Sequence, residues 1–326
     1  MADVSGTSGR AEQAQFPGMP TPLYAASASR LLAWLDCPRR YRFHYLDRPR
    51  PAPRPQRAHT SIGVAVHNAL RDWWDGSDRR PQAGARLVEA GWIEVGFRDP
   101  IQSQAWLERT RAEVTAYLQG VDPTRPPLGV ERIAAFKTDT LAFSGRIDRL
   151  DDRDGRLVVV DYKTGRRPFG ADDARGSLPL ALYAAAVWRM FRRRCVTVEL
   201  HHVPTGTVAW HEHSDESLVR KVREAESIAA DLRRADAAYA ADGADAACFP
   251  PRVSPLCQWC DYRAHCREGQ QAGPEKSSWA ALEENTDDRV TDEAHFGGPG
   301  EDPAGSGRDG GAPGPAADRP GEPGDR

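Results

Sequence analysis

The chain has 326 residues, of which 40% are hydrophobic and nine are tryptophan, enough for a sizeable core in one large domain or two modest ones. No apolar run reaches the roughly 18 residues of a membrane-spanning helix, and the first 20 residues lack the apolar segment of a signal peptide, so we expect a cytoplasmic protein with no membrane partner. The net charge of −3 is unevenly distributed: residues 275–326 carry 13 acidic and 5 basic side chains, whereas residues 1–274 carry 39 basic and 34 acidic. The mild positive charge of the first part is weak evidence for nucleic-acid binding by itself.

The two ends of the chain differ in composition from its middle. Residues 1–20 are small and polar, and residues 273–326 are rich in Gly, Pro, Asp, Glu and Ala. Such segments bury too little apolar surface to offset the entropy lost on ordering. We therefore expect a disordered leader over 1–20, one folded domain over 21–272 and a disordered acidic tail over 273–326.

Helical patterns come first in the folded domain. A serine (Ser27 or Ser29) is placed to cap a helix that ends at Cys37, and residues 60–74 carry an apolar stripe at helical spacing. His67 lies on this second helix. By residue type alone, Cys37 is an ordinary buried thiol and His67 is a packing or surface residue.

A β-hairpin is predicted near the middle of the chain. Residues 141–150 read as its first strand, and residues 151–155 are turn formers. Residues 157–160 are four apolar residues in a row, which is typical of a strand buried on both faces.

Charged residues occur in this hairpin where a buried strand should have none. Asp148 lies in the first strand, and Asp161 and Lys163 follow the apolar run on one face, at the two-residue period of a strand. Unpaired ions are costly in a core, so such groups are usually paired or bind a metal. Two carboxylates and an ammonium group at the end of a hairpin suit a site that holds a divalent cation and neutralises a phosphate. The alternative is a solvated strand end without a function.

The other elements follow from periodicity and from turn residues. They are a strand over 130–137, a helix over 172–191, a hairpin formed by 196–203 and 207–211, and an outer helix over 216–239.

Three cysteines lie close together near the end of the predicted domain, in the spacing Cys257-x2-Cys260-x5-Cys266. In a chain expected to be cytoplasmic, clustered cysteines favour a metal over disulfides. A C-x2-C turn lets two thiolates bind one centre, the third cysteine adds a ligand, and Cys37 is the best candidate for the fourth. Spacing alone leaves Zn²⁺ and a [4Fe–4S] cluster comparable, with zinc the commoner occupant of short sites of this kind.

The segments GRIDRLD, from Gly145, and VVVDYKTG, ending at Gly165, resemble the central signature of the PD-(D/E)XK nuclease superfamily, in its RecB-like branch of RecB and AddB nuclease domains. The resemblance implies an α/β fold with a mixed central β-sheet flanked by helices, a restriction-endonuclease-like core. It also implies a helical insertion, for which two helical patterns over residues 83–120 are suited.

The resemblance assigns roles to individual residues. It implies Mg²⁺ or Mn²⁺ held by His67, Asp148, Asp161 and the backbone carbonyl of Tyr162. Lys163 would orient the attacking water or stabilise developing charge, and Tyr183 would support the site from its helix.

Two further positions, Glu131 and Pro179, are compared with the family pattern. Glu131 lies where the family often has a glutamate beside the site, although a solvent-facing side chain is as good an explanation. Pro179 stands where family members usually have a glutamine, four residues before Tyr183. At this position the chain therefore has no residue for the role that the glutamine plays in the family.

The same resemblance favours an iron–sulfur cluster over zinc. AddB-type nucleases carry one cysteine before the nuclease core and three after it, and Cys37 with Cys257, Cys260 and Cys266 reproduces that division. A [4Fe–4S] cluster on these residues, most of them in segment 249–268, would join the N- and C-terminal ends of the domain.

The function implied is a Mg²⁺- or Mn²⁺-dependent deoxyribonuclease, an exonuclease that acts on single-stranded DNA ends in repair or recombination. The sequence contains no Gly-x-x-x-x-Gly-Lys-Ser/Thr phosphate loop, so a helicase, if one takes part, would be a separate partner. The alternative is a catalytically silent DNA-binding or scaffold protein that retains the nuclease fold.

Overall fold

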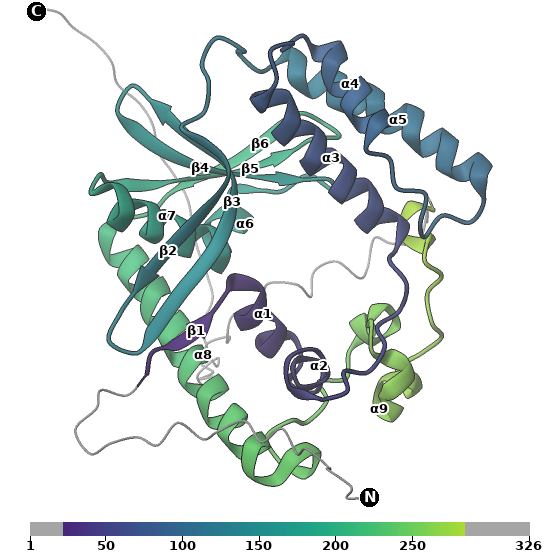
Figure 1. The fold of residues 1–326 in the computed structure, drawn as a ribbon, viewed down its shortest axis with the longest axis vertical. Helices are drawn as coiled ribbons and strands as arrows, with labels where there is room; N and C mark the ends of the chain where they lie inside the picture. Colours follow the sequence, from purple (N-terminus) through teal and green to yellow (C-terminus); the bar gives the residue numbers. More distant parts are fainter. Residues whose placement is uncertain (1–21, 284–326) are drawn as a thin grey trace, which may run out of the picture. The chain divides into compact units, whose positions relative to one another are not determined.

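A mixed β-sheet forms the centre of the computed structural model, which describes residues 22–283 (Figure 1). The strand order is β1-β3-β4-β5-β6, and β2 pairs with β3 beside this path. β1 is parallel to β3 and β4 is parallel to β5, whereas the other pairs are antiparallel. The strands are β1 (Tyr24–Ala26), β2 (Gly129–Lys137), β3 (Leu141–Arg153), β4 (Arg156–Lys163), β5 (Cys195–His202) and β6 (Thr207–Glu212).

Helices cover both faces of this sheet (Figure 1). One face of β4 (Val158, Val160) packs against α3, α4 and α5, and the other (Leu157, Val159) packs in a core with α1, α7 and α8. This is why the apolar run of β4 shows no alternation with polar residues. The helices are α1 (Ala28–Asp36), α2 (Pro38–Tyr41), α3 (Ala58–Asp75), α4 (Pro81–Ala90), α5 (Pro100–Gln119), α6 (Ala171–Gly176), α7 (Leu178–Phe191), α8 (Asp215–Asp242) and α9 (Arg267–Gln271). The expected α/β architecture, a mixed sheet flanked by helices, is confirmed.

Two local expectations were wrong. The turn of the central hairpin does not occupy residues 151–155: β3 runs to Arg153, β4 begins at Arg156, and only Asp154 and Gly155 form the turn, both with positive φ (54° and 91°). Pairing continues further than composition suggests because Asp151 and Arg153, just before the turn, form ion pairs with Arg149 and Glu199 on the sheet. Turn-forming residues therefore remain in the strand when their side chains have partners.

The helix expected over 172–191 is two helices. α6 and α7 are separated at Ser177, whose hydroxyl accepts a hydrogen bond from the N–H of Leu180 and caps α7. Pro179 lies in the first turn of α7, where a missing N–H costs nothing. In an unbroken helix the same residue would have lost a backbone hydrogen bond to Arg175.

A polar ring lies on the sheet face covered by α5. Arg149 is only 5% exposed, and its guanidinium donates to Asp151 and to the hydroxyl of Tyr162. Such a charge is stable in a core only when it is paired. The ring closes through Arg149, Asp151, Arg153, Glu199, His201 and Tyr117, each within hydrogen-bonding distance of the next.

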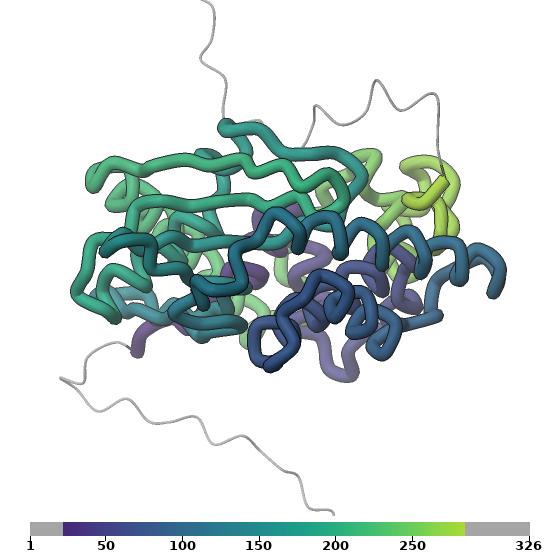
Figure 2. The backbone as a smooth tube through the Cα atoms, turned by 90° about the horizontal axis from the view of Figure 1, so that it is seen from above, coloured from purple at the N-terminus to yellow at the C-terminus, as the bar shows by residue number. Residues whose placement is uncertain are grey.

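The N- and C-terminal parts of the described chain lie side by side (Figure 2). The N–H of Arg54 donates to the carbonyl of Asp261 at 2.9 Å, and the ring of His44 lies 2.8 Å from the hydroxyl of Tyr262. The side chain of Arg39 donates to the carbonyl of Phe249. Short helical turns carry much of these segments, at Arg42–Leu46, Gly243–Asp245, Pro255–Trp259, Arg263–His265 and Ala280–Leu282.

Part of the segment expected as a tail packs on the domain. The carbonyl of Ser278 accepts a hydrogen bond from the N–H of Ala58 at the start of α3, and Leu282 is buried in the α3–α5 cluster. Residues 273–283 therefore continue the folded chain. The leader over 1–20 and the tail beyond 283 lie outside the described residues. Within the part of the chain that the structure describes, no helix has the length and apolarity needed to cross a bilayer.

The ring makes the stability of the fold depend on pH. Burial alone would raise the pKa of Glu199, but hydrogen bonds from His201 and Arg153 outweigh burial and lower the pKa from 4.5 to about 2. A depressed folded-state pKa stabilises the fold above the unfolded value, and this stabilisation is lost as the pH falls through the folded value. We expect Glu199→Gln to remove up to about 3 kcal/mol of stability near neutral pH and to flatten the pH dependence of unfolding between these two values.

Urea denaturation followed by circular dichroism across this pH range measures the effect. Glu94→Gln, at an exposed position, is the matched control. Parallel pH profiles for wild type and Glu199→Gln would contradict the assignment.

Candidate active site

Three side chains from three elements meet at one end of the sheet. Ligand atoms of His67 (α3), Glu131 (β2) and Asp148 (β3) all lie within 4.8 Å of one another. The Nδ1 atom of His67 is 3.4 Å from Oδ1 of Asp148. Gly63, one turn before His67, lies against the end of β4: a Cβ there would be 3.3 Å from the hydroxyl of Thr164, so a larger residue would require the threonine to shift.

Glu131 reaches this group through an unusual backbone conformation. Its φ is +48°, in the left-handed region that residues other than glycine rarely adopt. Its neighbours Val130 and Arg132 pair normally with β3, so the conformation is confined to the one residue. Strain of this kind costs about 1–3 kcal/mol and is typical of functional sites. From the sequence, a solvent-facing Glu131 was an equally good alternative. The folded chain shows that the Glu131 carboxylate lies toward His67 and Asp148.

Asp148 and Asp161 lie close together but make different contacts. Oδ2 of Asp148 accepts a hydrogen bond from the backbone N–H of Tyr162 at 2.8 Å, which fixes the carboxylate across the hairpin. Oδ2 of Asp161 lies 2.6 Å from Nζ of Lys163. Although the ions are this close, that oxygen is buried and has no hydrogen bond of good geometry. It therefore retains the capacity to bind a cation.

The electrostatics of the group reflect its crowded carboxylates. Burial and then the charge of Asp148 raise the pKa of Glu131, while Arg146 opposes the rise. Burial also raises the pKa of Asp161, against the effect of Lys163. Burial alone would lower the pKa of His67, but its hydrogen bond to Asp148 and the nearby carboxylates raise it.

This donor set fits a hard divalent cation. Carboxylate oxygens with one imidazole suit Mg²⁺ or Mn²⁺, and a cation would relieve the repulsion that raises the carboxyl pKa values. The structure favours Glu131 over Asp161 as the third member of the compact group. The backbone carbonyl of Tyr162 stays a predicted ligand.

Tyr183 lies beside the group on α7, against the start of the GRIDRLD segment. A Cβ at Gly145 would lie 2.5 Å from Cε1 of the Tyr183 ring, so only glycine fits there. Burial, followed by the charges of Asp161 and Asp148, raises the pKa of Tyr183 to about 12. The phenol is therefore a hydrogen-bond donor close to both carboxylates at neutral pH.

The four cysteines of interest lie in the joined terminal segments. The Sγ of Cys37 accepts a hydrogen bond from the N–H of Arg252, and the Sγ of Cys266 accepts one from the N–H of Gly269. Burial raises the pKa of the Cys260 and Cys266 thiols, and Cys37 contributes to both shifts. Among the residues described, no three cysteine sulfurs lie within 4.8 Å of one another, and all are free thiols.

Glu131 and Arg146 allow opposite effects on metal binding to be tested. Glu131→Gln is expected to weaken Mn²⁺ binding about tenfold or more, because it removes a charged ligand. Arg146→Ala is expected to strengthen binding, because its guanidinium lies 3.2 Å from Glu131 and competes with a cation. Calorimetric titration with Mn²⁺ measures both.

The matched control for this titration is Arg194→Ala, which breaks an exposed ion pair with Asp215 elsewhere. Equal Mn²⁺ affinity in wild type and all three variants would show that Glu131 is not a ligand.

Comparisons with known proteins bear on this site. No curated protein matches the chain. A candidate exonuclease from Eubacterium rectale is 12% identical, with a TM-score of 0.45 over 75% of this chain and 88% of that one. The protein SSO0001 is 13% identical, with a TM-score of 0.32 over 77% and 90%.

The match that identifies the family is to its sequence profile, over residues 25–267, which includes the hairpin, α3 and all four cysteines of interest. The chain belongs to the PD-(D/E)XK nuclease superfamily.

Proposed function

We propose that this nuclease-family chain is a metal-dependent deoxyribonuclease of the RecB-like type, an exonuclease that acts on single-stranded DNA ends in repair or recombination. Membership of the superfamily implies a nucleic-acid substrate. The observation that carries the proposal is the compact group of His67, Glu131 and Asp148 beside the Asp161–Lys163 pair. A helicase that supplies single strands would be a separate partner, because the chain has no phosphate loop of its own.

The carboxylates and the imidazole are the proposed metal ligands. Asp148, Asp161 and His67, with Glu131 and the carbonyl of Tyr162, would hold Mg²⁺ or Mn²⁺. Such a cation, when bound, lowers the pKa of a coordinated water and neutralises charge on the scissile phosphate.

Lys163 acts from beside Asp161. Its side chain is 37% exposed, so the ammonium group is open to substrate while Asp161 holds it at 2.6 Å. Nζ donates a hydrogen bond to the attacking water or to a phosphate oxygen, where negative charge develops. The hydroxyl of Tyr183 supports the carboxylates from α7.

The alternative is a DNA-binding or scaffold protein without catalysis. Pro179 supports it, since the residue lies where related nucleases usually have a glutamine. The buried carboxylates oppose it, because a silent protein gains nothing from their repulsion.

Digestion of end-labelled single-stranded and duplex DNA, with Mg²⁺ or with EDTA, tests these proposals. We expect Mg²⁺-dependent release of short products from single-stranded ends, and a loss of about a hundredfold or more in rate for Lys163→Ala. Lys137→Ala, at the exposed end of β2, is the matched control. Wild-type protein that binds but never cleaves DNA would favour the scaffold, and equal rates for wild type and Lys163→Ala would remove Lys163 from catalysis.

We further propose that Cys37, Cys257, Cys260 and Cys266 bind a [4Fe–4S] cluster that joins the two ends of the folded domain, with 83–120 as its helical insertion. Backbone N–H donors already point at two of the sulfurs, as is common for metal-bound thiolates. The division of the cysteines, with one before the nuclease core and three after it, is the feature that favours a cluster over zinc.

Anaerobic purification with iron analysis tests the cluster. We expect a brown protein with about four iron atoms per chain, and a Cys257→Ser variant that loses both the iron and several degrees of melting temperature. Cys248→Ser is the control, because Cys248 lies outside the spacing pattern. A colourless protein that contains zinc would overturn the assignment.

A further inference from the structure

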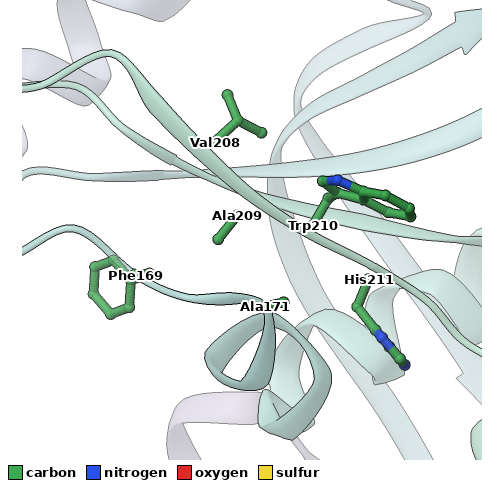
Figure 3. Close-up of a pocket in the computed structure, with 6 residues that line it drawn as sticks. All are labelled: Phe169, Ala171, Val208, Ala209, Trp210 and His211. Atoms are coloured by element: carbon green, nitrogen blue, oxygen red, sulfur yellow. The ribbon is translucent and has the colours of Figure 1, made fainter. Parts of the chain in front are cut away.

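A cavity at the β6 edge of the sheet has no role in the chemistry described so far. Its volume is about 450 Å³, within the range of small-molecule sites, about 300–1,000 Å³. It lies between β6 and the start of α6, with the loop that follows β4 alongside (Figure 3). The lining residues are Phe169, Ala171, Val208, Ala209, Trp210 and His211.

The lining is apolar and aromatic, without a carboxylate, lysine or arginine. Burial, and then the charge of Arg175, lower the pKa of His211, so its imidazole is uncharged at neutral pH. Arg175 itself is paired with Asp172 at 2.9 Å. The cavity therefore suits an uncharged, flat group better than it suits a phosphate.

The strand register places this cavity beside the candidate active site. Asp161 pairs with Leu200, which pairs with Ala209, so all three side chains project from the same face of the sheet. Two strand spacings, about 10 Å, separate Asp161 from Ala209. Ala209 and His211 therefore share one face of the sheet with Asp161, whereas Val208 and Trp210, at the alternate positions of β6, project from the other face. The part of the cavity lined by Ala209 and His211 is close enough to the carboxylates to contact the same short piece of a polymer.

The chain itself connects the two places. The loop from Lys163 to Phe169 runs from one to the other, and the carbonyl of Gly165 in this loop lies 2.6 Å from Nε2 of His202. The ring of Phe169 packs edge-on to His202, with ring centroids 6.4 Å apart. Between them, residues 165–168 are exposed, so the loop forms a surface path from the carboxylates to the cavity.

We propose that this cavity binds an unpaired nucleobase of the strand whose phosphate lies at the active site, with Phe169 and His211 as its aromatic walls. The inference deepens the proposed function and rests on it. Stacking on aromatic side chains tolerates every base, because each has a flat π-face, and it selects single strands over duplexes. The cavity would thus hold single-stranded ends next to the metal group.

Binding is tested first, without catalysis. Oligothymidylate added in EDTA is expected to change the tryptophan emission of the wild type, because Trp210 lines the cavity and is 59% exposed. The change is expected to disappear in Trp210→Phe, which removes the reporter alone. His211→Ala is expected to weaken oligothymidylate binding about tenfold.

Kinetics separate this site from the catalytic group. We expect Phe169→Leu, which keeps bulk for packing but removes the ring, and His211→Ala each to lower kcat/KM for oligothymidylate about tenfold relative to kcat/KM for a small phosphodiester, thymidine 5′-(p-nitrophenyl phosphate). Ile133→Ala, 67% exposed on β2 away from the cavity, is the control and should leave this ratio unchanged.

The outcomes distinguish the two proposals. If wild type hydrolyses neither substrate, the proposed nuclease activity fails, and the binding measurement in EDTA still decides whether the cavity takes a base. If wild type cleaves both and the Phe169 and His211 variants keep the wild-type ratio, the base site is wrong and the nuclease stands. If the variants instead turn a dimer into a monomer in sedimentation with unchanged oligonucleotide binding, the edge of β6 is a protein interface and the inference is overturned.

Discussion

The crowding of carboxylates at one end of the sheet is the constraint around which the rest of this structure is arranged. Glu131, Asp148 and Asp161 come from three strands into a partly buried space, where each negative charge raises the cost of the next. The fold tolerates this cost through three contacts: the imidazole of His67 lies against Asp148, the ammonium group of Lys163 lies against Asp161, and a backbone N–H donates to Asp148. A divalent cation would remove most of this repulsion. The arrangement is therefore favourable for a metal site and unfavourable as a purely structural one.

Tyr162 connects this group to the polar ring on the opposite face of the sheet. Its backbone N–H binds Asp148, its hydroxyl accepts from Arg149, and its ring lies edge-on to His67, with centroids 6.0 Å apart. Tyr162, which lies between Asp161 and Lys163, is therefore held by its backbone, its hydroxyl and its ring. Because Asp161 and Lys163 alternate with Tyr162 along β4, the contact of Tyr162 with the polar ring holds in place the strand that carries both side chains.

The joined terminal segments give the site its outer support. α3, which carries His67, begins where Ser278 accepts a hydrogen bond from Ala58, and the loop before α3 is bound through Arg54 to Asp261. The cysteines proposed to hold a cluster lie in these same segments. Loss of the contacts between the two ends would therefore loosen the start of the helix that positions His67.

Sequence patterns determined much about this protein. The central hairpin and the helix with His67 followed from periodicity, and the charges of Asp148, Asp161 and Lys163 at one end of this hairpin were visible in the sequence. The α/β class was implied by the resemblance of GRIDRLD and VVVDYKTG to a known family. These features are local, so a few neighbouring residues specify them.

Tertiary structure alone decided the rest: the left-handed Glu131 that turns its carboxylate inward, the close fit of Gly145 under Tyr183, the division of α6 from α7, and the packing of Leu282 on α3. Each of these depends on partners distant in the chain or on a competition between a side-chain contact and a backbone preference, and neither can be read from a residue and its immediate neighbours.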